Sequence, residues 1–177
     1  MLAFDSTIAA GIRLLILDVD GVLTNAHLVL GPSGEEIKEF SVRDGIGIKV
    51  AQYAGIEVIF LSARVSEIVK RRAEMLGVNE IYQGEQQKLA VVRQIAERHG
   101  VELSAIAYVG DDLVDMASID AVGIGVAVGD ACSDLLESAP YVADSPGGRG
   151  AVRETIEAIL KARGEWKRLV TEFLASI

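Results

Sequence analysis

The stretch "RLLILDVDGVLT", residues 13–24, joins a run of aliphatic side chains to two aspartates and a glycine. The aliphatic run predicts a strand over residues 13–19 that is buried on both faces, as the strands of a parallel sheet are. Asp18 and Asp20 stand at its carboxyl end, and residues two apart on an extended chain face the same way. Because a buried carboxylate is costly unless it is compensated, the stretch predicts a site that holds a cation or a ligand.

Short β-branched segments alternate with longer amphipathic ones along the rest of the chain. This alternation predicts an α/β fold, a doubly wound and mostly parallel sheet with helices on both faces. Further strands are expected at 57–63, 105–111, 122–128 and 141–144, and helices at 45–54, 65–76, 86–99, 113–120, 132–138, 150–162 and 165–175.

Residues 26–40, "AHLVLGPSGEEIKEF", interrupt the alternation of strands and helices. Two alternating segments flank Gly-Pro-Ser-Gly, which predicts a β-hairpin inserted after the first strand. No linker is long enough to separate domains, so one domain is expected over residues 1–177 without a cap domain. Residues 147–177 form its glycine-rich segment and its C-terminal helix and tail.

Composition restricts the partners of the protein. Half of the 177 residues are hydrophobic, which suffices for a core, and 17 basic against 26 acidic residues give a net charge of -9. This balance argues against nucleic acid or an anionic membrane and favours a small solute. No apolar run approaches the roughly 20 residues of a membrane span, and "MLAFDSTIAAGIR" does not resemble a signal peptide, so a cytoplasmic location is expected.

The single cysteine, Cys132, cannot form an internal disulfide. Together with His27 and His99 it lacks the spacing of a zinc site. These three side chains are therefore expected to be structural or exposed.

The chemistry of an open parallel sheet lies beyond the carboxyl ends of its strands. The strand that follows the hairpin ends in Ser62 and Arg64, and the next long strand ends in Asp111 and Asp112, with Asp115 shortly after. Clustered carboxylates cannot all ionise unless a cation lies among them, and oxygen ligands at this density suit Mg²⁺. A plainer interpretation of Asp111 and Asp112 is that one of them caps the following helix.

Lys88 opens a helical segment and adds the positive charge that a phosphate ligand would need. An ammonium, a hydroxyl such as that of Ser62, and Mg²⁺ can neutralise a phosphoryl group during its transfer. A carboxylate can then attack phosphorus, and a second carboxylate two residues on can protonate the leaving alcohol and deprotonate the attacking water.

Four segments carry a family resemblance when they are taken together and in order. "DVDGVLT", "LSAR", Lys88 and "VGDDLVD" resemble the four motifs of the haloacid dehalogenase superfamily of phosphatases. "EFSVRDGIGIK" (39–49), "YQGEQQK" (82–88) and "GGRGAVRE" (147–154) resemble its capless branch of sugar-acid phosphatases. The likeness covers residues 13 to 160 and implies a Rossmann-like core.

The resemblance implies a role for each matching residue. Asp18 would be the nucleophile that forms an aspartyl-phosphate, and Asp20 the general acid and base. Ser62 and Lys88 would hold the transferring phosphoryl group. Mg²⁺ would be held by Asp18, by the backbone carbonyl of Asp20 and by Asp111, while Asp112 or Asp115 would orient metal-bound water or Lys88.

The same resemblance implies a substrate, 3-deoxy-D-manno-octulosonate 8-phosphate, whose hydrolysis leads toward the lipopolysaccharide core. Arginine at position 64 favours this eight-carbon ester, because relatives that act on 2-keto-3-deoxy-nonulosonate 9-phosphate tend to carry glutamate there. The nine-carbon ester stays open as an alternative. Taken singly, Arg43, Lys49 and Arg72 are more often surface charges than ligands. The contacts to the sugar acid that the resemblance implies are Ser41, Val42, Arg43, Asp44, Gly45, Lys49, Arg64, Arg72 and Lys88.

The capless branch is typically tetrameric, so the resemblance also implies a homotetramer whose hairpins meet at its centre. Residues 147–150 and the tail after them would be a mobile lid that reaches a neighbouring subunit's site. Two other classes compete with an enzyme. A phosphoacceptor signalling module would not need Asp20, and a silent oligomerisation module should have lost one of Asp18, Asp20, Lys88 or Asp111, all of which are present.

Overall fold

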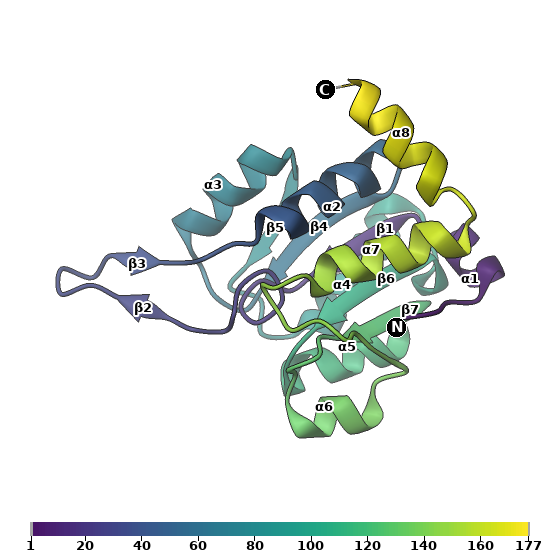
Figure 1. The fold of residues 1–177 in the computed structure, drawn as a ribbon. Coiled ribbons are helices and arrows are strands. Elements are labelled where there is room, and N and C mark those ends of the chain that lie inside the picture. The colour runs from purple at the N-terminus through teal and green to yellow at the C-terminus, as the bar shows by residue number, and fades with distance from the viewer. Residues whose placement is uncertain (1, 177) are drawn as a thin grey trace.

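The computed structural model describes residues 2–176, and a six-stranded sheet lies at its centre (Figure 1). Every neighbouring pair of its strands is parallel. β1 is central, and the chain moves outward from it first to one side and then to the other, which confirms a doubly wound sheet. The strands lie in the order β5 (Glu80–Gln83), β4 (Glu57–Ser62), β1 (Leu14–Leu17), β6 (Ile106–Gly110), β7 (Ile124–Ala127) and β8 (Tyr141–Val142).

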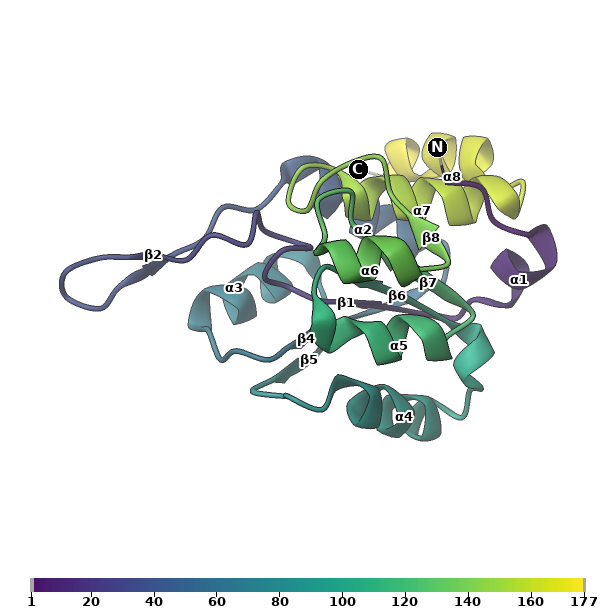
Figure 2. The same ribbon diagram turned by 90° about the horizontal axis from the view of Figure 1, so that it is seen from below.

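Helices cover both faces of this sheet (Figures 1 and 2). The first layer consists of α2 (Val42–Tyr53) and α7 (Ala151–Ala162), with α3 (Glu67–Leu76), α8 (Trp166–Ser176) and α1 (Ser6–Gly11) beside them. The second consists of α4 (Lys88–His99) and α5 (Met116–Ala121), with α6 (Ser133–Ser138) against α5. The short 3₁₀ helices η1 (Leu103–Ala105) and η2 (Leu113–Asp115) flank β6.

Sequence patterns located these elements to within a few residues, with three omissions, of which the 3₁₀ helix η1 is the shortest. β5 was not predicted, because "EIYQ" is short, polar and only half-buried at the sheet edge. α1 was not predicted either; Asp5 caps it by accepting hydrogen bonds from the amides of Thr7 and Ile8 at 2.8 and 3.1 Å. α2 begins earlier than expected because the Ser41 hydroxyl accepts the Asp44 amide at 3.2 Å and caps the helix.

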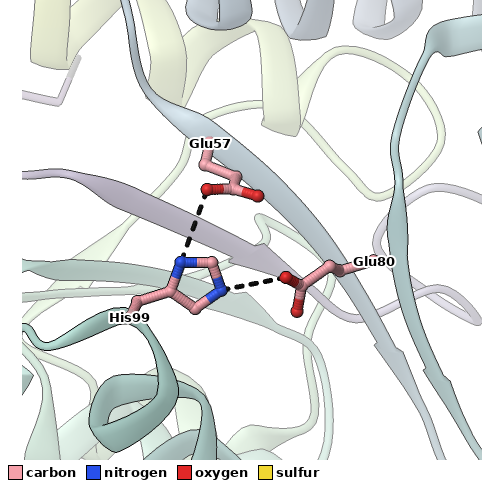
Figure 3. A group of neighbouring side chains, drawn as sticks. All are labelled: Glu57, Glu80 and His99. Atoms are coloured by element: carbon pink, nitrogen blue, oxygen red, sulfur yellow. Dashed lines mark hydrogen bonds and ion pairs between the residues drawn. The ribbon is translucent and has the colours of Figure 1, made fainter.

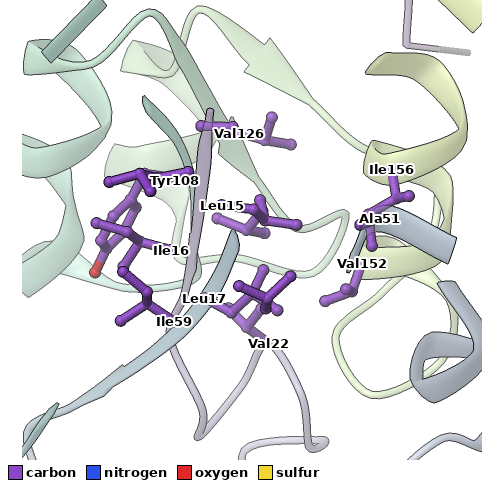
Figure 4. Packing of buried hydrophobic residues seen from close by; sticks show 14 of the residues in the cluster. Leu15, Ile16, Leu17, Val22, Ala51, Ile59, Tyr108, Val126, Val152 and Ile156 are labelled. Carbon is purple, nitrogen blue, oxygen red and sulfur yellow. The ribbon is translucent and has the colours of Figure 1, made fainter. Parts of the chain in front are cut away.

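The core surrounds β1, whose four residues are all buried (Figure 4). Ile16 lies beside Ile59 and Tyr108 in the neighbouring strands, on the face toward α5. Leu15 and Leu17 point to the other face, where α2 and α7 contribute Ala51, Val152 and Ile156. Burial of aliphatic area on both faces is worth about 25 cal/mol per Å², and it fixes the end of β1 as a rigid platform.

The inserted hairpin is present, with β2 (Val29–Leu30) antiparallel to β3 (Glu36–Ile37). It projects away from the rest of the protein (Figure 1). Its apolar side chains Leu28, Val29, Leu30 and Ile37 are 43 to 61% exposed. An isolated two-stranded ribbon is marginally stable in water, so this element lacks the partners that a stable sheet has.

Residues 147–150 fold against their own subunit, and the prediction of a mobile lid over a neighbour is not supported. The Gly148 amide donates to the Val22 carbonyl at 2.8 Å, and the Gly147 amide donates to the Asp130 carboxylate at 2.8 Å. A Cβ on Gly147 would lie 1.6 Å from the Gly21 carbonyl oxygen, so only glycine allows this approach. Among residues 2–176, no helix is long and apolar enough to cross a membrane.

Candidate active site

A hollow of about 240 Å³ lies at the carboxyl ends of β1, β4 and β6. This is the switch point of the sheet, where the chain leaves β1 toward opposite edges and where ligands of such sheets bind. All of the predicted catalytic and metal-binding residues line it. The lining consists of Asp18, Asp20, Ala26, Ser62, Ala63, Arg64, Lys88, Asp111, Asp112 and Val114.

Lys88 lies between two buried carboxylates. Its ammonium is 2.9 Å from Asp18 Oδ1 and 2.7 Å from Asp115 Oδ1, and its side chain is 1% exposed. Burial works to lower the pKa of Lys88, but the charges of Asp18 and Asp115 outweigh it and the pKa is raised. Lys88 therefore stays charged and is held toward the hollow.

Asp115 positions Lys88 and does not face the hollow. It is fully buried, and besides the lysine it accepts three hydrogen bonds, from the Tyr108 hydroxyl at 2.6 Å, from the Asp111 amide at 3.0 Å and from the Asp112 amide at 3.2 Å. A Cβ on Gly110 would lie 2.4 Å from the Asp115 Cβ, so glycine leaves the room that Asp115 occupies. Of the two roles predicted for it, this geometry favours orienting Lys88. Sequence reasoning missed Tyr108, because within the strand it has the pattern of any core residue.

The carboxylates of Asp18 and Asp111 lie close together in a largely buried site, so their ionised forms are unfavourable. Burial first, and then the Asp115 charge, raises the pKa of Asp18 to about 6, although Lys88 opposes the shift. Burial and the charges of Asp18 and Asp115 raise the pKa of Asp111 to about 8. Both shifts show that the ionised pair lacks a compensating positive charge.

A magnesium ion fits this deficit. One carboxylate oxygen each of Asp18, Asp111 and Asp115 lie within 4.8 Å of one another. Asp115 is already committed to Lys88, Tyr108 and backbone amides, so Asp18 and Asp111 are the side chains free to hold the ion. Mg²⁺ prefers oxygen ligands, and proteins often bind it through one or two carboxylates together with the oxygens of a substrate phosphate.

The turn after β1 brings these carboxylates together. The amides of Val22, Leu23 and Thr24 all point at the Val19 carbonyl, at 3.4, 3.0 and 3.1 Å. Gly21 has a φ of +97°, and a Cβ there would lie 1.8 Å from Asp111 Oδ2. Glycine is therefore required both by the backbone and by the approach of Asp111.

Asp20 lies at the mouth of the hollow among cations. Lys38, from the end of the hairpin, forms an ion pair with its Oδ1, and Arg64 Nε is 3.7 Å from its Oδ2. Glu36 contacts both cations, Lys38 at 3.2 Å and Arg64 at 3.5 Å. Sequence reasoning missed Lys38 and Glu36, although the alternation of "EIKEF" places both on one face of a strand.

Ser62 and Asp112 take different parts in the site. The Ser62 hydroxyl is buried at the end of β4 and accepts the Arg64 amide at 3.1 Å, which aims it at the hollow. The Asp112 carboxylate accepts the Leu113 amide at 2.8 Å and so caps η2, as the plainer interpretation of the sequence held. It nevertheless also lines the hollow.

The predicted sugar contacts on α2 and α3 do not line this hollow. Asp44 is buried and accepts the amides of Gly150 at 3.2 Å and Arg153 at 2.9 Å, so its carboxylate caps α7, and the prediction that it binds substrate is not supported. Arg72 donates to the Ser41 carbonyl at 3.0 Å. Arg43 lies in another hollow of about 570 Å³ beside α7, which holds none of the catalytic residues. The residues that the structure does not bring to the site are Ser41, Val42, Arg43, Asp44, Gly45, Lys49 and Arg72.

Comparisons with known proteins agree with this geometry. The family model described as haloacid dehalogenase-like hydrolase matches residues 61–156. The chain belongs to this family of hydrolases. It is 45% identical over 157 residues to the 3-deoxy-D-manno-octulosonate 8-phosphate phosphatase KdsC of Escherichia coli K12, covering 89% of this chain and 84% of that protein.

Solved structures resemble the chain over most of its length. A 3-deoxy-D-manno-octulosonate 8-phosphate phosphatase from Yersinia pestis has a TM-score of 0.89 and 41% identity, over 92% of this chain and 88% of that one. The Moraxella catarrhalis enzyme, in complex with a magnesium ion, a phosphate ion and KDO, has a TM-score of 0.91 and 36% identity, over 95 and 97% of the two chains. These likenesses confirm the predicted fold and family.

Proposed function

We infer that the chain is a Mg²⁺-dependent phosphatase that hydrolyses 3-deoxy-D-manno-octulosonate 8-phosphate to the free sugar acid and phosphate. One observation carries this inference: Asp18, Asp20, Ser62, Lys88 and Asp111 converge on one hollow at the switch point of the sheet. The identity to enzymes named for this substrate supports its choice. The free sugar acid would then serve lipopolysaccharide synthesis, and a cytoplasmic location stays a prediction.

The first half-reaction transfers the phosphoryl group to the protein. The free carboxylate oxygen of Asp18 attacks phosphorus while the bond to the sugar oxygen breaks, and Asp20 gives that oxygen a proton. Lys88 and the Ser62 hydroxyl contact the phosphoryl oxygens as charge moves onto them. When bound beside Asp18 and Asp111, Mg²⁺ supplies further charge neutralisation and keeps both carboxylates ionised.

The second half-reaction releases phosphate. Asp20, now ionised, takes a proton from a water molecule, and that water attacks phosphorus of the aspartyl-phosphate. The bond between phosphorus and the Asp18 oxygen breaks, which regenerates the carboxylate. Lys38 and Arg64 support this role because they hold Asp20 at the mouth of the hollow, where the leaving oxygen and the water must enter.

Arg64 supports selection of a sugar acid. Its side chain is 49% exposed at the rim of the hollow, beside Asp20 and Glu36. A planar guanidinium in this position can pair with a carboxylate on the sugar. The remaining predicted contacts, at the start of α2 and on α2 and α3, would have to come from another subunit.

We also propose the homotetramer. The hairpin supports it, because an apolar ribbon that projects from the protein needs partners, and a ring of subunits gives each site one neighbour. Leu30→Asp together with Ile37→Asp should convert the assembly to smaller species in sedimentation analysis. Met75→Asp, on an exposed side chain of α3, is the control; unchanged tetramers in the hairpin variant would reject the proposal.

Phosphate release from the eight-carbon and nine-carbon keto-sugar phosphates tests the function, with Mg²⁺ or with chelator. Asp18→Asn should lower turnover by at least about 10⁴-fold, as loss of a nucleophile does. Asp120→Asn, an exposed aspartate on α5, is the matched control and should keep full activity. Activity of Asp18→Asn equal to the parent would reject the mechanism, whereas preference for the nine-carbon ester would reject only the substrate.

Arg64→Glu tests the selection separately. It should raise KM for the eight-carbon ester by about 10- to 100-fold, because a bidentate charged contact is replaced by repulsion. The kcat should fall less than KM rises, since Lys38 still pairs with Asp20 when Arg64 is replaced. An unchanged KM would show that the sugar carboxylate is bound elsewhere.

A further inference from the structure

Lys38 and Glu36, at the base of the hairpin, are two charged side chains that take no direct part in the two half-reactions. The Lys38 side chain is 1% exposed, and that of Glu36 is 17% exposed. A lysine side chain is rarely buried this deeply unless its charge is paired. Neither residue lines the hollow, so neither is placed to touch the substrate. Lys38 instead contacts Asp20, the proposed general acid and base.

The Asp20 carboxylate depends on Lys38 for its orientation. Lys38 forms an ion pair with Asp20 Oδ1. Arg64 Nε, at 3.7 Å from Oδ2, makes a longer contact from a side chain that is 49% exposed. Within residues 2–176 these two cations are the only partners of the carboxylate, whereas Asp115 is also held by backbone amides. Lys38 therefore fixes Oδ1, and Oδ2 is left to carry the proton toward the leaving oxygen.

Glu36 holds Lys38 in place. Its Oε1 is 3.2 Å from the Lys38 ammonium and 3.5 Å from Arg64, and its Oε2 accepts the Ser66 hydroxyl at 2.6 Å. Burial works to raise the pKa of Glu36, but the hydrogen bond from Ser66 and the charge of Lys38 outweigh it and the pKa is lowered. Glu36 therefore stays an anion, and both of its oxygens have partners.

Ser66 connects Glu36 to the central sheet. It is buried just before α3, and its amide donates to the side-chain oxygen of Gln83 at 2.5 Å. The Gln83 side chain donates in return to the Ser66 carbonyl at 3.3 Å, and Gln83 is the last residue of β5. The hairpin beyond this attachment projects away from the protein (Figure 1). Without the attachment, Lys38 would move with a marginally stable ribbon.

We propose that Lys38 and Glu36 are positioning residues for the general acid and base, an inference that rests on the proposed phosphatase function. Lys38 holds Asp20 so that Oδ2 meets the leaving oxygen in the first half-reaction and the water in the second, and Glu36 holds Lys38. A displacement of about 1 Å can cost roughly 100-fold in rate, so an Asp20 carboxylate without these partners would be a much poorer acid. The inserted hairpin thus serves the reaction as well as the proposed assembly.

A double-mutant cycle tests the assignment, because a positioning residue affects the reaction only through the group that it holds. Lys38→Met should lower kcat/KM for the eight-carbon ester by about 10- to 100-fold. Asp20→Asn should lower it by about 10²- to 10⁴-fold, as loss of a general acid does. The double variant should be no more than about twofold slower than Asp20→Asn alone. An equally large loss from Lys38→Met in the Asp20→Asn background would overturn the proposal.

Aryl phosphates separate positioning of the acid from general damage to the site. Dinitrophenolate leaves without a proton, whereas phenolate leaves much faster when an acid protonates it. Lys38→Met should therefore lower kcat/KM by about tenfold or more for phenyl phosphate and by less than about threefold for dinitrophenyl phosphate. Neither ester has a carboxylate for Arg64, and a nearly unchanged dinitrophenyl rate also shows that the variant is folded. Equal losses for the two esters would overturn the proposal.

Glu36→Gln and two controls complete the test. Glu36→Gln keeps the shape of the side chain but removes the charge that holds Lys38, so kcat/KM should fall by about threefold to tenfold, and an unchanged value would overturn the role of Glu36. Lys70→Met and Glu39→Gln, on exposed side chains, should keep full activity. The proposed function fails separately. Asp20→Asn as active as the parent would reject the general acid itself, whereas a slow Asp20→Asn beside an unchanged Lys38→Met would reject only the role of Lys38.

Discussion

The two ends of helix α4 each place a basic side chain between two carboxylates, but in different surroundings. At its start, Lys88 is 1% exposed and its partners Asp18 and Asp115 are 6 and 0% exposed. At its end, the His99 ring lies between Glu57 and Glu80 (Figure 3); His99 is 17% exposed, and these two partners are 47 and 15% exposed. The pairing at Lys88 is buried away from water and supports catalysis. The similar pairing at His99 is partly exposed to water and contributes little energy.

The difference follows from the solvent around each charge. Breaking a buried ion pair leaves an uncompensated charge that water cannot reach, whereas an exposed pair contributes little because water and salt screen it. Of the two ends, only the one at Lys88 has an excess of negative charge that favours Mg²⁺, because Asp111 adds a third carboxylate beside Asp18 and Asp115. Four measurements can break or sharpen this comparison.

Lys88→Met should have the largest effect. It leaves Asp18 and Asp115 facing each other without a cation, so the free energy of unfolding should fall by about 3–5 kcal/mol. Turnover should fall by at least about 10³-fold, because a charge that stabilises the transferring phosphoryl group is lost. Urea denaturation and phosphate release check both. Lys70→Met is the control, since Lys70 pairs with Glu67 on the surface and should cost less than about 0.5 kcal/mol.

Removal of Mg²⁺ should make stability depend on pH. The folded pKa of Asp111, about 8, and that of Asp18, about 6, both lie above the unfolded value of 3.8. The native state therefore holds protons that the unfolded state has lost, and stability declines as pH rises from about 4 to 8. In chelator the loss should be about 3 kcal/mol or more, and Mg²⁺ should abolish most of it.

Thermal unfolding at pH 5, 6.5 and 8 measures this effect, with chelator and with Mg²⁺. Mg²⁺ should raise the unfolding temperature most at pH 8, where both carboxylates are ionised and can bind it. Parallel pH profiles in the two buffers would contradict the electrostatic account of the catalytic end. Asp111→Asn should flatten the profile in chelator, because it removes the higher of the two titrations.

Tyr108→Phe should have an intermediate effect. It removes the hydroxyl that donates to Asp115 at 2.6 Å and leaves that buried carboxylate with one donor fewer. The free energy of unfolding should fall by about 1–2 kcal/mol, and turnover by less than about tenfold, because Lys88 keeps its contact with Asp115. Tyr53→Phe, on a half-exposed ring, is the control. A variant as stable as the parent would show that the hydroxyl is not needed to hold Asp115.

His99→Gln in chelator should have the smallest effect. Its contacts with Glu57 and Glu80 are partly exposed, so their loss should cost less than about 1 kcal/mol, and turnover should stay within about twofold of the parent. Urea denaturation and phosphate release are measured for His99→Gln in parallel with Lys88→Met, which completes the comparison. A loss as large as that of Lys88→Met would mean that exposure does not separate the two ends of α4.

The catalytic residues could be predicted because, apart from Lys88, each of them stands at or just after the end of a strand that the sequence pattern locates. Asp18, Ser62 and Asp111 each stand where a β-branched run ends, and the carboxyl ends of parallel strands meet at one edge. The supporting residues could not be predicted in the same way. Tyr108 lies within a strand like any core residue, and only the packed structure shows that its hydroxyl reaches Asp115.

Predictions for α2 and for residues 147–150 show a further limit. Asp44 has the residue type of a ligand, but its carboxylate caps α7 more than a hundred residues away along the chain, at the amides of Gly150 and Arg153. The same contacts hold the glycine-rich segment that was expected to be mobile. A local pattern does not reveal whether a polar side chain already has a partner from a distant segment.

The amino-acid sequence by itself determined the parallel α/β fold, the inserted hairpin and the identity of the reacting groups, because strand periodicity, turn residues and the positions of Asp18, Asp20, Lys88 and Asp111 are local properties. The tertiary structure decided which charged side chains are buried from solvent. Burial of Lys88 between Asp18 and Asp115, and exposure of Glu57 beside His99, depend on segments that are distant in the chain and packed together only in the fold. Solvent access, which no local pattern encodes, sets the energy of each pair.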